Sequence, residues 1–151
     1  MMEKLNLPEY DFKIKDDGGK KYIFDNLRKK YLILTPEEWV RQNIIRFLVE
    51  EKGFPTGLIS VEAGINVNSL KRRYDALIYS RIGKPFVLVE CKAPSVKLTQ
   101  KVFEQILAYN SKIAAPNLLI TNGISHYFLS HNPSGKFQFI NDIPTFDLLS
   151  S

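Results

Sequence analysis

Two neighbouring runs of apolar and aromatic residues lie near the middle of the chain. Residues 72–80 and residues 85–94 are both rich in β-branched, aromatic and aliphatic side chains, and a short segment containing Gly83 separates them. Runs of this kind on either side of a glycine-containing turn are typical of a β-hairpin. The pattern therefore predicts two adjacent antiparallel strands, although both carry charges that an interior strand would not be expected to have.

The charges of this predicted hairpin fall on one face of the sheet. Side chains alternate across a strand, so Glu90 and Lys92 share one face while Val89 and Cys91 point to the other. Asp75 lies on the neighbouring strand, within lateral reach of the charged face. Two carboxylates and an amine are therefore expected to meet at one place. Such a cluster is costly without a neutralising group, because desolvated carboxylates repel each other and their pKa values rise.

A divalent cation would neutralise this cluster. Mg2+ is usually bound through one or two carboxylates together with water and substrate phosphates. Asp75 and Glu90 supply such a pair, and the backbone carbonyl of Cys91 is expected to supply one more oxygen to the metal. Lys92 beside the metal would lower the pKa of an attacking water or stabilise charge that builds on phosphorus. The alternative interpretation is an ordinary surface salt bridge between Glu90 and Lys92.

A helix start with several agreeing signals precedes the hairpin. Thr35 is predicted to be the N-cap, Pro36 the first helical residue and Glu38 the partner in a capping box. The helix is predicted to end near Lys52, because Gly53 follows. Its predicted core stripe consists of Val40, Ile44, Phe47 and Leu48.

The rest of the chain alternates between strand and helix patterns. The Asp-Asp-Gly-Gly turn at 16–19 predicts an N-terminal β-hairpin. A strand that follows a helix is expected to lie parallel to a central strand. We therefore expect an α/β fold with a central mixed sheet flanked by helices. The predicted elements are hairpin strands at 10–15 and 21–24, a basic connection at 28–31, a strand at 58–67 with Gly64 as a bulge, a helix at 98–114, and strands at 117–121, 126–130 and 136–140.

Length and composition favour one compact domain. The chain has 151 residues, of which 44% are hydrophobic and 25% charged, as expected for a protein with a single core. Residues 1–34 are predicted to form the hairpin arm with its basic connection, and residues 35–151 the main domain. No run is long and apolar enough to cross a bilayer and the N-terminus lacks a signal-peptide core, so we expect a cytoplasmic protein without a membrane partner.

The few sulfur and imidazole side chains offer no separate chemistry. Cys91 is the lone cysteine, and no histidine lies near it in sequence, so it is interpreted as a small apolar residue. His126 and His131 are interpreted as structural or exposed residues, and two histidines with one cysteine make a metal site of the Cys/His type improbable.

The net charge of +5 modestly favours a polyanionic partner. Basic residues gather in two places, one before the predicted first helix and one leading into the strand of Asp75. Such side chains contact phosphates without reading sequence. For residues 28–31, a solvated linker is an equally good interpretation. The two clusters consist of Lys20, Lys21, Arg28, Lys29 and Lys30, and of Lys71, Arg72 and Arg73.

The order of these motifs resembles a known family. Asp75, followed by Glu90 and Lys92 with one residue between them, resembles the PD-(D/E)XK nuclease signature, in which the acids bind the metal and the lysine assists the water. Residues 35–42 resemble the first helix of the N-terminal nuclease domain of type I restriction enzyme R subunits. Tyr74 departs from the pattern, which has proline at that position. The resemblance covers most of the chain and implies a restriction-endonuclease-like fold.

Further site residues are suggested by the same resemblance. Gln105 and Tyr109 match the QxxxY helix of one branch of the superfamily, and Gln105 would orient Lys92 or the water while Tyr109 touches a phosphate. A first-helix glutamate binds metal in related nucleases, which makes Glu38 a candidate, although its capping box already explains it. Tyr109 as a core residue and Glu62 as an exposed residue are the alternative interpretations.

These observations predict a Mg2+-dependent DNA endonuclease, with Mn2+ as a second metal that the site would accept. R subunits continue into a helicase motor, whereas this sequence contains no G-x-x-x-x-G-K-[ST] loop, so we expect a standalone nuclease without a motor. DNA, a helicase or modification subunit, and a second copy of the chain are the expected partners. The alternatives are a catalytically inactive DNA-binding module of a restriction or repair complex and, less well supported, a nucleotide-binding α/β protein.

Overall fold

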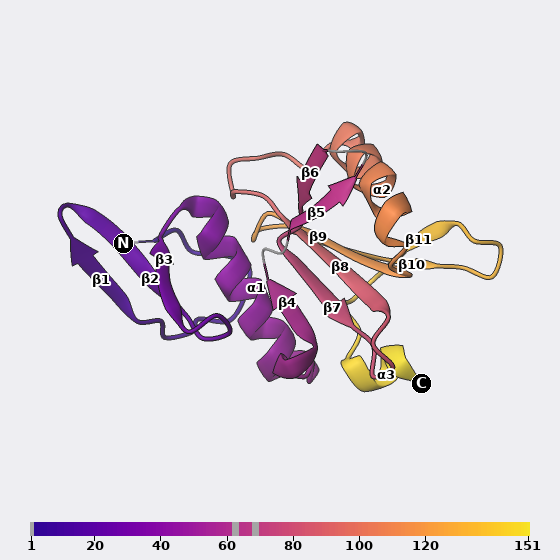
Figure 1. The fold of residues 1–151 in the computed structure, drawn as a ribbon, viewed down its shortest axis with the longest axis horizontal. Helices are drawn as coiled ribbons and strands as arrows, with labels where there is room; N and C mark the ends of the chain where they lie inside the picture. The colour runs from indigo at the N-terminus through magenta and orange to yellow at the C-terminus, as the bar shows by residue number, and fades with distance from the viewer. Residues whose placement is uncertain (1, 62–63, 68–69) are drawn as a thin grey trace.

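A six-stranded mixed sheet forms the centre of the molecule (Figure 1). The computed structural model describes residues 2–61, 64–67 and 70–151, and for 64–67 and 70–73 it describes the backbone only. The strand order is β11-β10-β9-β8-β7-β4. β8 and β9 run parallel, and the other neighbouring pairs are antiparallel. The strands are β4 (Ile59–Val61), β7 (Ala76–Tyr79), β8 (Pro85–Cys91), β9 (Asn117–Thr121), β10 (His126–His131) and β11 (Phe137–Ile140).

The two faces of this sheet carry separate hydrophobic cores. Val87, Val89 and Cys91 of β8 pack on the side of helix α1 (Pro36–Lys52), while Leu88 packs on the side of helix α2 (Gln100–Ile113). The alternation predicted for this strand is therefore confirmed, with the fully buried Cys91 acting as a small apolar residue. The predicted α/β fold with a mixed sheet flanked by helices is also confirmed.

Helix α1 begins and ends where its capping residues predict. The Thr35 hydroxyl accepts a hydrogen bond from the Glu38 N–H at 3.0 Å, and Pro36 is the first helical residue. Gly53 follows the last turn in the left-handed region, with φ 70°, which glycine adopts without strain. Three of the four residues of the predicted core stripe are fully buried and Phe47 is half-buried. The buried apolar residues are Val40, Ile44, Ile45 and Leu48.

Helix α2 is shorter than the predicted range of 98–114. Thr99 caps its start by accepting a hydrogen bond from the Val102 N–H. At its end Ala114 adopts φ 61°, and the Asn110 side chain bonds both the N–H and the carbonyl of Ala115. These two caps fix the helix between them.

A separate three-stranded antiparallel sheet consists of β1 (Ile14–Asp17), β2 (Lys20–Asp25) and β3 (Lys30–Ile33). The predicted hairpin is confirmed, and Gly18 and Gly19 both have positive φ at its turn. The prediction of a basic connection at 28–31 was wrong, because this segment turns into β3. The Asp25 carboxylate fixes that turn by accepting hydrogen bonds from the N–H groups of Leu27 and Arg28.

The N-terminal segment lies across α1 before it enters β1. The Trp39 indole donates a hydrogen bond to the Glu3 carbonyl at 2.8 Å, and its ring packs edge-on against Phe12. The Asn6 N–H donates to the carbonyl of Gly123, in the turn between β9 and β10. These contacts join the first residues of the chain to both α1 and the central sheet. The predicted boundary between residues 34 and 35 stays a prediction.

Two predicted strands are each divided between two sheets. The run 72–80 forms the end of β6 (Leu70–Arg73) and the whole of β7. Between them the Asp75 side chain accepts a hydrogen bond from the Cys91 N–H, which in a continuous strand would bond to the backbone of the neighbouring strand. The run 58–67 forms β4 and β5 (Gly64–Val67), after a 3-10 turn at Thr56–Leu58. β5 pairs with β6. Gly64, predicted as a bulge, is the first residue of β5 and lies opposite Arg73 in this pair. Glu62 lies outside the described residues.

The C-terminal part follows the predicted order of elements. β9 runs parallel to β8, and β10 and β11 complete the sheet as antiparallel strands. A short helix, α3 (Phe146–Ser150), was not predicted; Phe146 is fully buried against Phe54 and Phe86. None of the helices in the described part of the chain has the length and apolar character needed to span a bilayer.

Candidate active site

Asp75 and Glu90 come together where the hairpin of β7 and β8 ends. Ala76 lies opposite Val89 in the ladder, so the next position along places Asp75 opposite Glu90 on the same face. Asp75 Oδ2 accepts a hydrogen bond from the Cys91 N–H at 2.7 Å. Asp75 is half-buried, and Glu90 is only 8% exposed. The structure thus brings together the two acids that the sequence singled out.

The environment of this pair disfavours two negative charges. Burial is the main cause that raises the pKa of Asp75, and the Cys91 N–H partly offsets it. Burial and then the neighbouring Asp75 carboxylate raise the pKa of Glu90, while Lys92 acts in the opposite direction. Two carboxylates that crowd in a place of low dielectric hold a proton or a cation between them.

One oxygen of this pair is buried without a hydrogen-bond partner. Among the residues that the structure describes, Glu90 Oε1 has no donor within reach and is closed off from solvent. A buried acceptor in this state costs free energy unless a ligand satisfies it. A hard divalent cation fits the donor set, because it accepts carboxylate oxygens and keeps open positions for water and phosphate. The residues present therefore fit Mg2+, which Asp75 and Glu90 would hold.

The described residues contain no group of three or more His, Cys, Asp or Glu side chains arranged to hold a metal. The site thus offers two carboxylates. This number is the usual protein contribution to a Mg2+ site whose other ligands are water and substrate phosphate.

Lys92 directly follows β8, on the side of Glu90. Its N–H donates to the Thr121 carbonyl at 2.9 Å, and its ammonium is close enough to Glu90 to lower the pKa of that carboxyl. The next turn is held by Asn122, whose amide donates to the Val96 carbonyl at 2.8 Å. The end of β9 and the turn after it therefore hold the backbone at Lys92 and at Val96, which are the two ends of the segment that follows β8. The sequence analysis missed this supporting role of Asn122.

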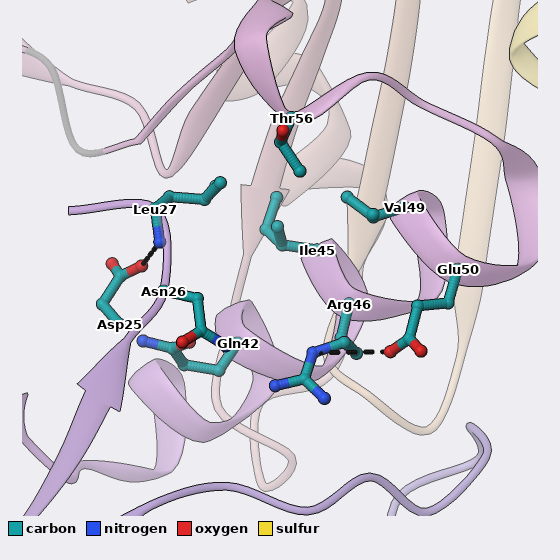
Figure 2. Close-up of a pocket in the computed structure, with 9 residues that line it drawn as sticks. All are labelled: Asp25, Asn26, Leu27, Gln42, Ile45, Arg46, Val49, Glu50 and Thr56. Carbon is teal, nitrogen blue, oxygen red and sulfur yellow. Dashed lines mark hydrogen bonds and ion pairs between the residues drawn. The ribbon is translucent and has the colours of Figure 1, made fainter. Parts of the chain in front are cut away.

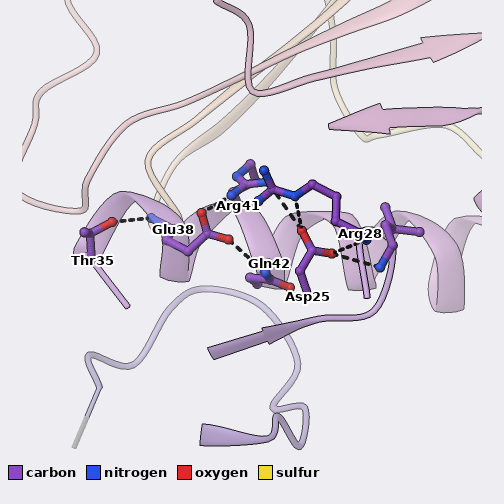
Figure 3. Close-up of polar contacts among 7 residues, drawn as sticks. Asp25, Arg28, Thr35, Glu38, Arg41 and Gln42 are labelled. Atoms are coloured by element: carbon purple, nitrogen blue, oxygen red, sulfur yellow. Dashed lines mark hydrogen bonds and ion pairs between the residues drawn. The ribbon is translucent and has the colours of Figure 1, made fainter. Parts of the chain in front are cut away.

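The Glu38 carboxylate is bonded to neighbours on its own helix, and its role as a metal ligand stays a prediction. It accepts hydrogen bonds from Arg41 and from the Gln42 amide, the latter at 2.8 Å (Figure 3). Glu37, which was not predicted, raises the pKa of both Asp75 and Glu90 through its charge. The helical spacing could have indicated Glu37. It precedes the buried Val40 by three residues and the buried Ile44 by seven, so it lies on the same side of the helix as these two residues.

Arg41 is a second residue that the sequence analysis missed. It is 2% exposed, and its guanidinium lies between the carboxylates of Glu38 and Asp25 (Figure 3). Asp25 also binds the Arg28 Nε at 2.8 Å. Arg41 lowers the pKa of Asp75 by its charge. A buried network of charges therefore connects β2 and α1.

The QxxxY residues lie on α2, on the other face of the sheet from α1. Gln105 is exposed, and Tyr109 is half-buried and packs against the core beneath α2. Ile106 between them is buried. The roles of Gln105 and Tyr109 in the reaction stay predictions.

The basic residues of the predicted DNA contacts differ in their surroundings. Arg28 forms an ion pair with Asp25 that holds the turn before β3. Lys29 and Lys30 are exposed, and Lys29 adopts φ 56° in that turn. The side chains of Lys71, Arg72 and Arg73 lie outside the described part of the chain, although the backbone of β6 ends two residues before Asp75.

The histidines have structural surroundings. His126 Nδ1 lies 2.7 Å from the Thr121 hydroxyl, and its Nε2 lies 2.8 Å from the Asn6 carbonyl. His131 is exposed and packs on Phe137. Both therefore match the interpretation as structural or exposed residues.

A cavity of about 340 Å3 lies elsewhere, between the turn after β2 and α1 (Figure 2). Its apolar wall comes from Leu27, Ile45 and Val49, and its polar groups come from Asp25, Asn26, Gln42, Arg46, Glu50 and Thr56. Asp75 and Glu90 do not line it. The candidate active site is thus an arrangement of acids at the end of two strands, separate from this cavity.

Known proteins share a sequence pattern and a fold with this chain. Residues 36–144 match the family model described as type I restriction enzyme R protein N terminus. No curated protein matches the chain. The chain is similar to a fragment of a proposed HsdR subunit of a type I restriction enzyme from Vibrio vulnificus YJ016, with a TM-score of 0.54, 21% identity, and coverage of 77% of this chain and 24% of that one.

A second solved structure is less similar. It is a protein from Anabaena variabilis ATCC 29413, assigned to DUF820 and described there as a suspected nuclease, with a TM-score of 0.47, 10% identity, and coverage of 95% of this chain and 87% of that one. This similarity is too low to support a shared fold by itself. The chain spans about a quarter of the length of the Vibrio fragment. Because the family model covers most of the chain, the protein belongs to the family of type I restriction enzyme R protein N-terminal domains.

Proposed function

We propose that this protein is a Mg2+-dependent DNA endonuclease domain. The observation that carries the proposal is the convergence of Asp75 and Glu90, with a buried Glu90 oxygen that has no donor among the described residues. Membership of a restriction enzyme family supports a nuclease-like role and DNA as the substrate. When bound, Mg2+ would polarise a phosphoryl oxygen and make a bound water more acidic.

The residues of the chain have distinct parts in the proposed reaction. Asp75 and Glu90 hold the cation, and Lys92 stabilises the negative charge on the phosphate or the attacking water. The water oxygen forms a bond to phosphorus as one ester P–O bond breaks, which leaves a phosphate monoester on one end and a hydroxyl on the other. Gln105 is proposed to align the water. The Asp75 bond to the Cys91 N–H holds that carboxylate in place before the substrate arrives.

A helicase or modification subunit is a proposed partner, since the family belongs to multi-subunit restriction enzymes. Mn2+ is proposed to replace Mg2+, and a second copy of the chain would supply the second active site for cutting both strands.

The test is nicking of supercoiled plasmid in Mg2+ or Mn2+. Asp75→Asn and Lys92→Ala are expected to lower the rate on the order of 100-fold or more, because each removes a group that acts on the reacting atoms. Asp142→Asn and Lys112→Ala are matched controls, since both residues are exposed and away from the acid pair. These controls should cut like the wild type.

Two results would contradict the proposal. Equal cutting by Asp75→Asn and wild type would assign the activity to a contaminant. DNA binding by the wild type, with no cutting in either metal, would instead support a catalytically inactive DNA-binding module.

A further inference from the structure

The outward face of the N-terminal sheet combines aromatic rings with lysines. The ladder places Lys15, Tyr22 and Ile33 side by side, and beside them Phe24 lies opposite Tyr31. Lys13 continues this second row, since its carbonyl accepts the Phe24 N–H. On the opposite face, Ile23 is fully buried and Asp25 pairs with Arg41 of α1. The first set of side chains therefore forms the face turned away from α1, here called the aromatic-lysine face.

The ammonium groups of this face lie over its rings. Lys15 Nζ is 4.2 Å from the centre of the Tyr31 ring and 6.0 Å from that of Tyr22. Lys13 Nζ is 5.5 Å from the centre of the Phe24 ring, and the Phe24 and Tyr31 rings meet edge to face at 5.2 Å. Tyr31 is 37% exposed. Rings and cations thus alternate at the spacing of neighbouring residues on a strand surface.

We propose that the aromatic-lysine face binds single-stranded DNA. Proteins that bind single strands stack bases on aromatic side chains and neutralise the backbone with nearby cations. Lys13, Lys15 and Lys20 lie on this face against one acid, Asp17, so its charge complements a phosphate backbone. The proposal rests on DNA as the substrate of the proposed function and adds the form of DNA and the place where it binds.

The same features disfavour a duplex or a protein as the occupant. Bases inside a duplex are stacked on each other and offer their edges to a protein, whereas the rings here require an open base face. An apolar protein partner would have to desolvate an ammonium beside each ring without supplying a partner for it, which is unfavourable. A single strand provides both a base for the ring and a phosphate for the cation.

The lysine positions do not block this binding. An exposed cation–π contact is weak, so the Lys15 ammonium can move to a phosphate while a base takes its place on Tyr31. The face is also held in place relative to the candidate active site. Asp25 on its reverse side pairs with the buried Arg41 of α1, and α1 packs against β8, the strand that carries Glu90. A strand on this face would therefore have a defined position with respect to the acid pair.

The aromatic-lysine face lies outside the part of the chain that matches the family model, which begins at residue 36. The proposed binding is thus a property of residues 13–33 of this chain, added to the family domain.

The test is filter binding of an end-labelled oligothymidylate of about 15 nucleotides, a length in the range of known single-strand sites. The full chain is used in EDTA, so that binding is measured without cleavage. Tyr31→Ala is expected to weaken binding about fivefold or more, and Tyr31→Phe to retain it, because the ring is the binding group. Lys15→Gln is expected to weaken binding and to reduce the salt slope by about 0.7.

The matched control for the lost charge is Lys136→Gln, an exposed lysine between β10 and β11. This control is expected to bind within twofold of the wild type. The proposal is overturned if Tyr31→Ala binds as tightly as Lys136→Gln, or if a duplex of the same length depends equally on Tyr31. It is also overturned if Tyr31→Ala changes only the sedimentation of the protein, which would assign the face to self-association.

The outcome is separable from that of the nicking assay. Binding that depends on Tyr31, in a protein that does not cut plasmid, would retain the aromatic-lysine face and reject the nuclease. Cutting that depends on Asp75, with no effect of Tyr31 on oligothymidylate binding, would retain the nuclease and reject the face.

Discussion

Glu90 differs from an ordinary surface glutamate in its burial and in its neighbours. It is buried beside Asp75, and one oxygen has no donor among the described residues. Its charge is therefore unfavourable in the metal-free protein, and a cation or a proton relieves that cost. A residue of this kind stabilises the protein when a cation is bound and destabilises it when no cation is bound.

This property predicts a specific pH dependence for the metal-free protein. Burial and Asp75 raise the pKa of Glu90 above its ordinary value of 4.5. Between that value and the raised pKa, the folded state binds more protons than the unfolded state, so the contribution of Glu90 to the free energy of unfolding falls as the pH rises. The free energy of unfolding of Glu90→Gln, a neutral isostere, should therefore match that of the wild type near pH 4 and exceed it by about 1–3 kcal/mol near pH 8.

Urea unfolding in EDTA at several pH values measures this difference. Glu104→Gln is the matched control, because Glu104 is an exposed residue of α2. A constant difference between wild type and Glu90→Gln across this range would contradict the prediction. The difference between the two proteins removes the pH dependence of groups that do not interact with Glu90, so what remains belongs to the interacting pair of Asp75 and Glu90.

At the residue scale, the sequence analysis found the acids and the lysine because their spacing on two strands is regular. Glu38 is a candidate in the sequence because the start of a helix can place either a capping box or a metal ligand there, and sequence position alone does not separate these two roles. In the structure the Glu38 carboxylate accepts hydrogen bonds from Arg41 and Gln42. Arg41 in turn pairs with Asp25 of the N-terminal sheet, so the partners of Glu38 depend on where that sheet lies. The role of Arg41 depends on the same tertiary contact, so no local pattern could reveal it.

At the element scale, helices with clear caps were predicted best. Thr35 and Gly53 are local signals that act within one turn of backbone, so α1 agrees with its prediction at both ends. The runs 58–67 and 72–80 were predicted as single strands, because β-propensity does not tell which sheet a strand joins. The division of the run 72–80 coincides with the side-chain bond from Asp75 to Cys91, a contact between residues 16 positions apart.

The turn between β9 and β10 gives a prediction at this scale. Gly123 has φ 87°, and a Cβ there would lie 2.8 Å from a methyl of Leu5 and 3.1 Å from one of Val40. Gly123→Ala is therefore expected to lower the free energy of unfolding by about 1–3 kcal/mol, from backbone strain and from displacement of the N-terminal segment.

The control for this variant is Gly57→Ala, because Gly57 lies where a Cβ would meet nothing within 4 Å and its backbone does not need a positive φ. Thermal unfolding of the two variants measures the effect. Equal melting temperatures of the two variants would contradict the prediction, because they would mean that Leu5 and the turn can move to make room for the Cβ without loss of stability.

At the scale of the whole molecule, the network of Asp25, Arg28, Glu38 and Arg41 joins the N-terminal sheet to the rest of the protein (Figure 3). Buried ion pairs do not add much net stability, since their desolvation offsets the attraction. Removal of one partner is different, because it leaves the remaining charges buried without compensation.

Arg41→Gln is therefore expected to lower the free energy of unfolding by about 3–5 kcal/mol. Lys112→Gln, which removes an exposed charge from α2, should change it by less than about 0.5 kcal/mol. Urea unfolding of both variants provides the measurement. Equal free energies of unfolding for Arg41→Gln and Lys112→Gln would contradict the prediction. They would mean that the buried carboxylates of Asp25 and Glu38 do not need Arg41, and that the network does not stabilise the contact between the N-terminal sheet and α1.

Trp39 makes one consequence of this arrangement directly observable. It is the sole tryptophan of the chain, and its indole N–H is bonded to the Glu3 carbonyl while its ring meets Phe12. The intrinsic emission of the protein therefore originates at the contact between the N-terminal segment and α1. Release of that segment into water would shift this emission to longer wavelength, so unlabelled protein carries its own optical reporter of whether its first residues are docked.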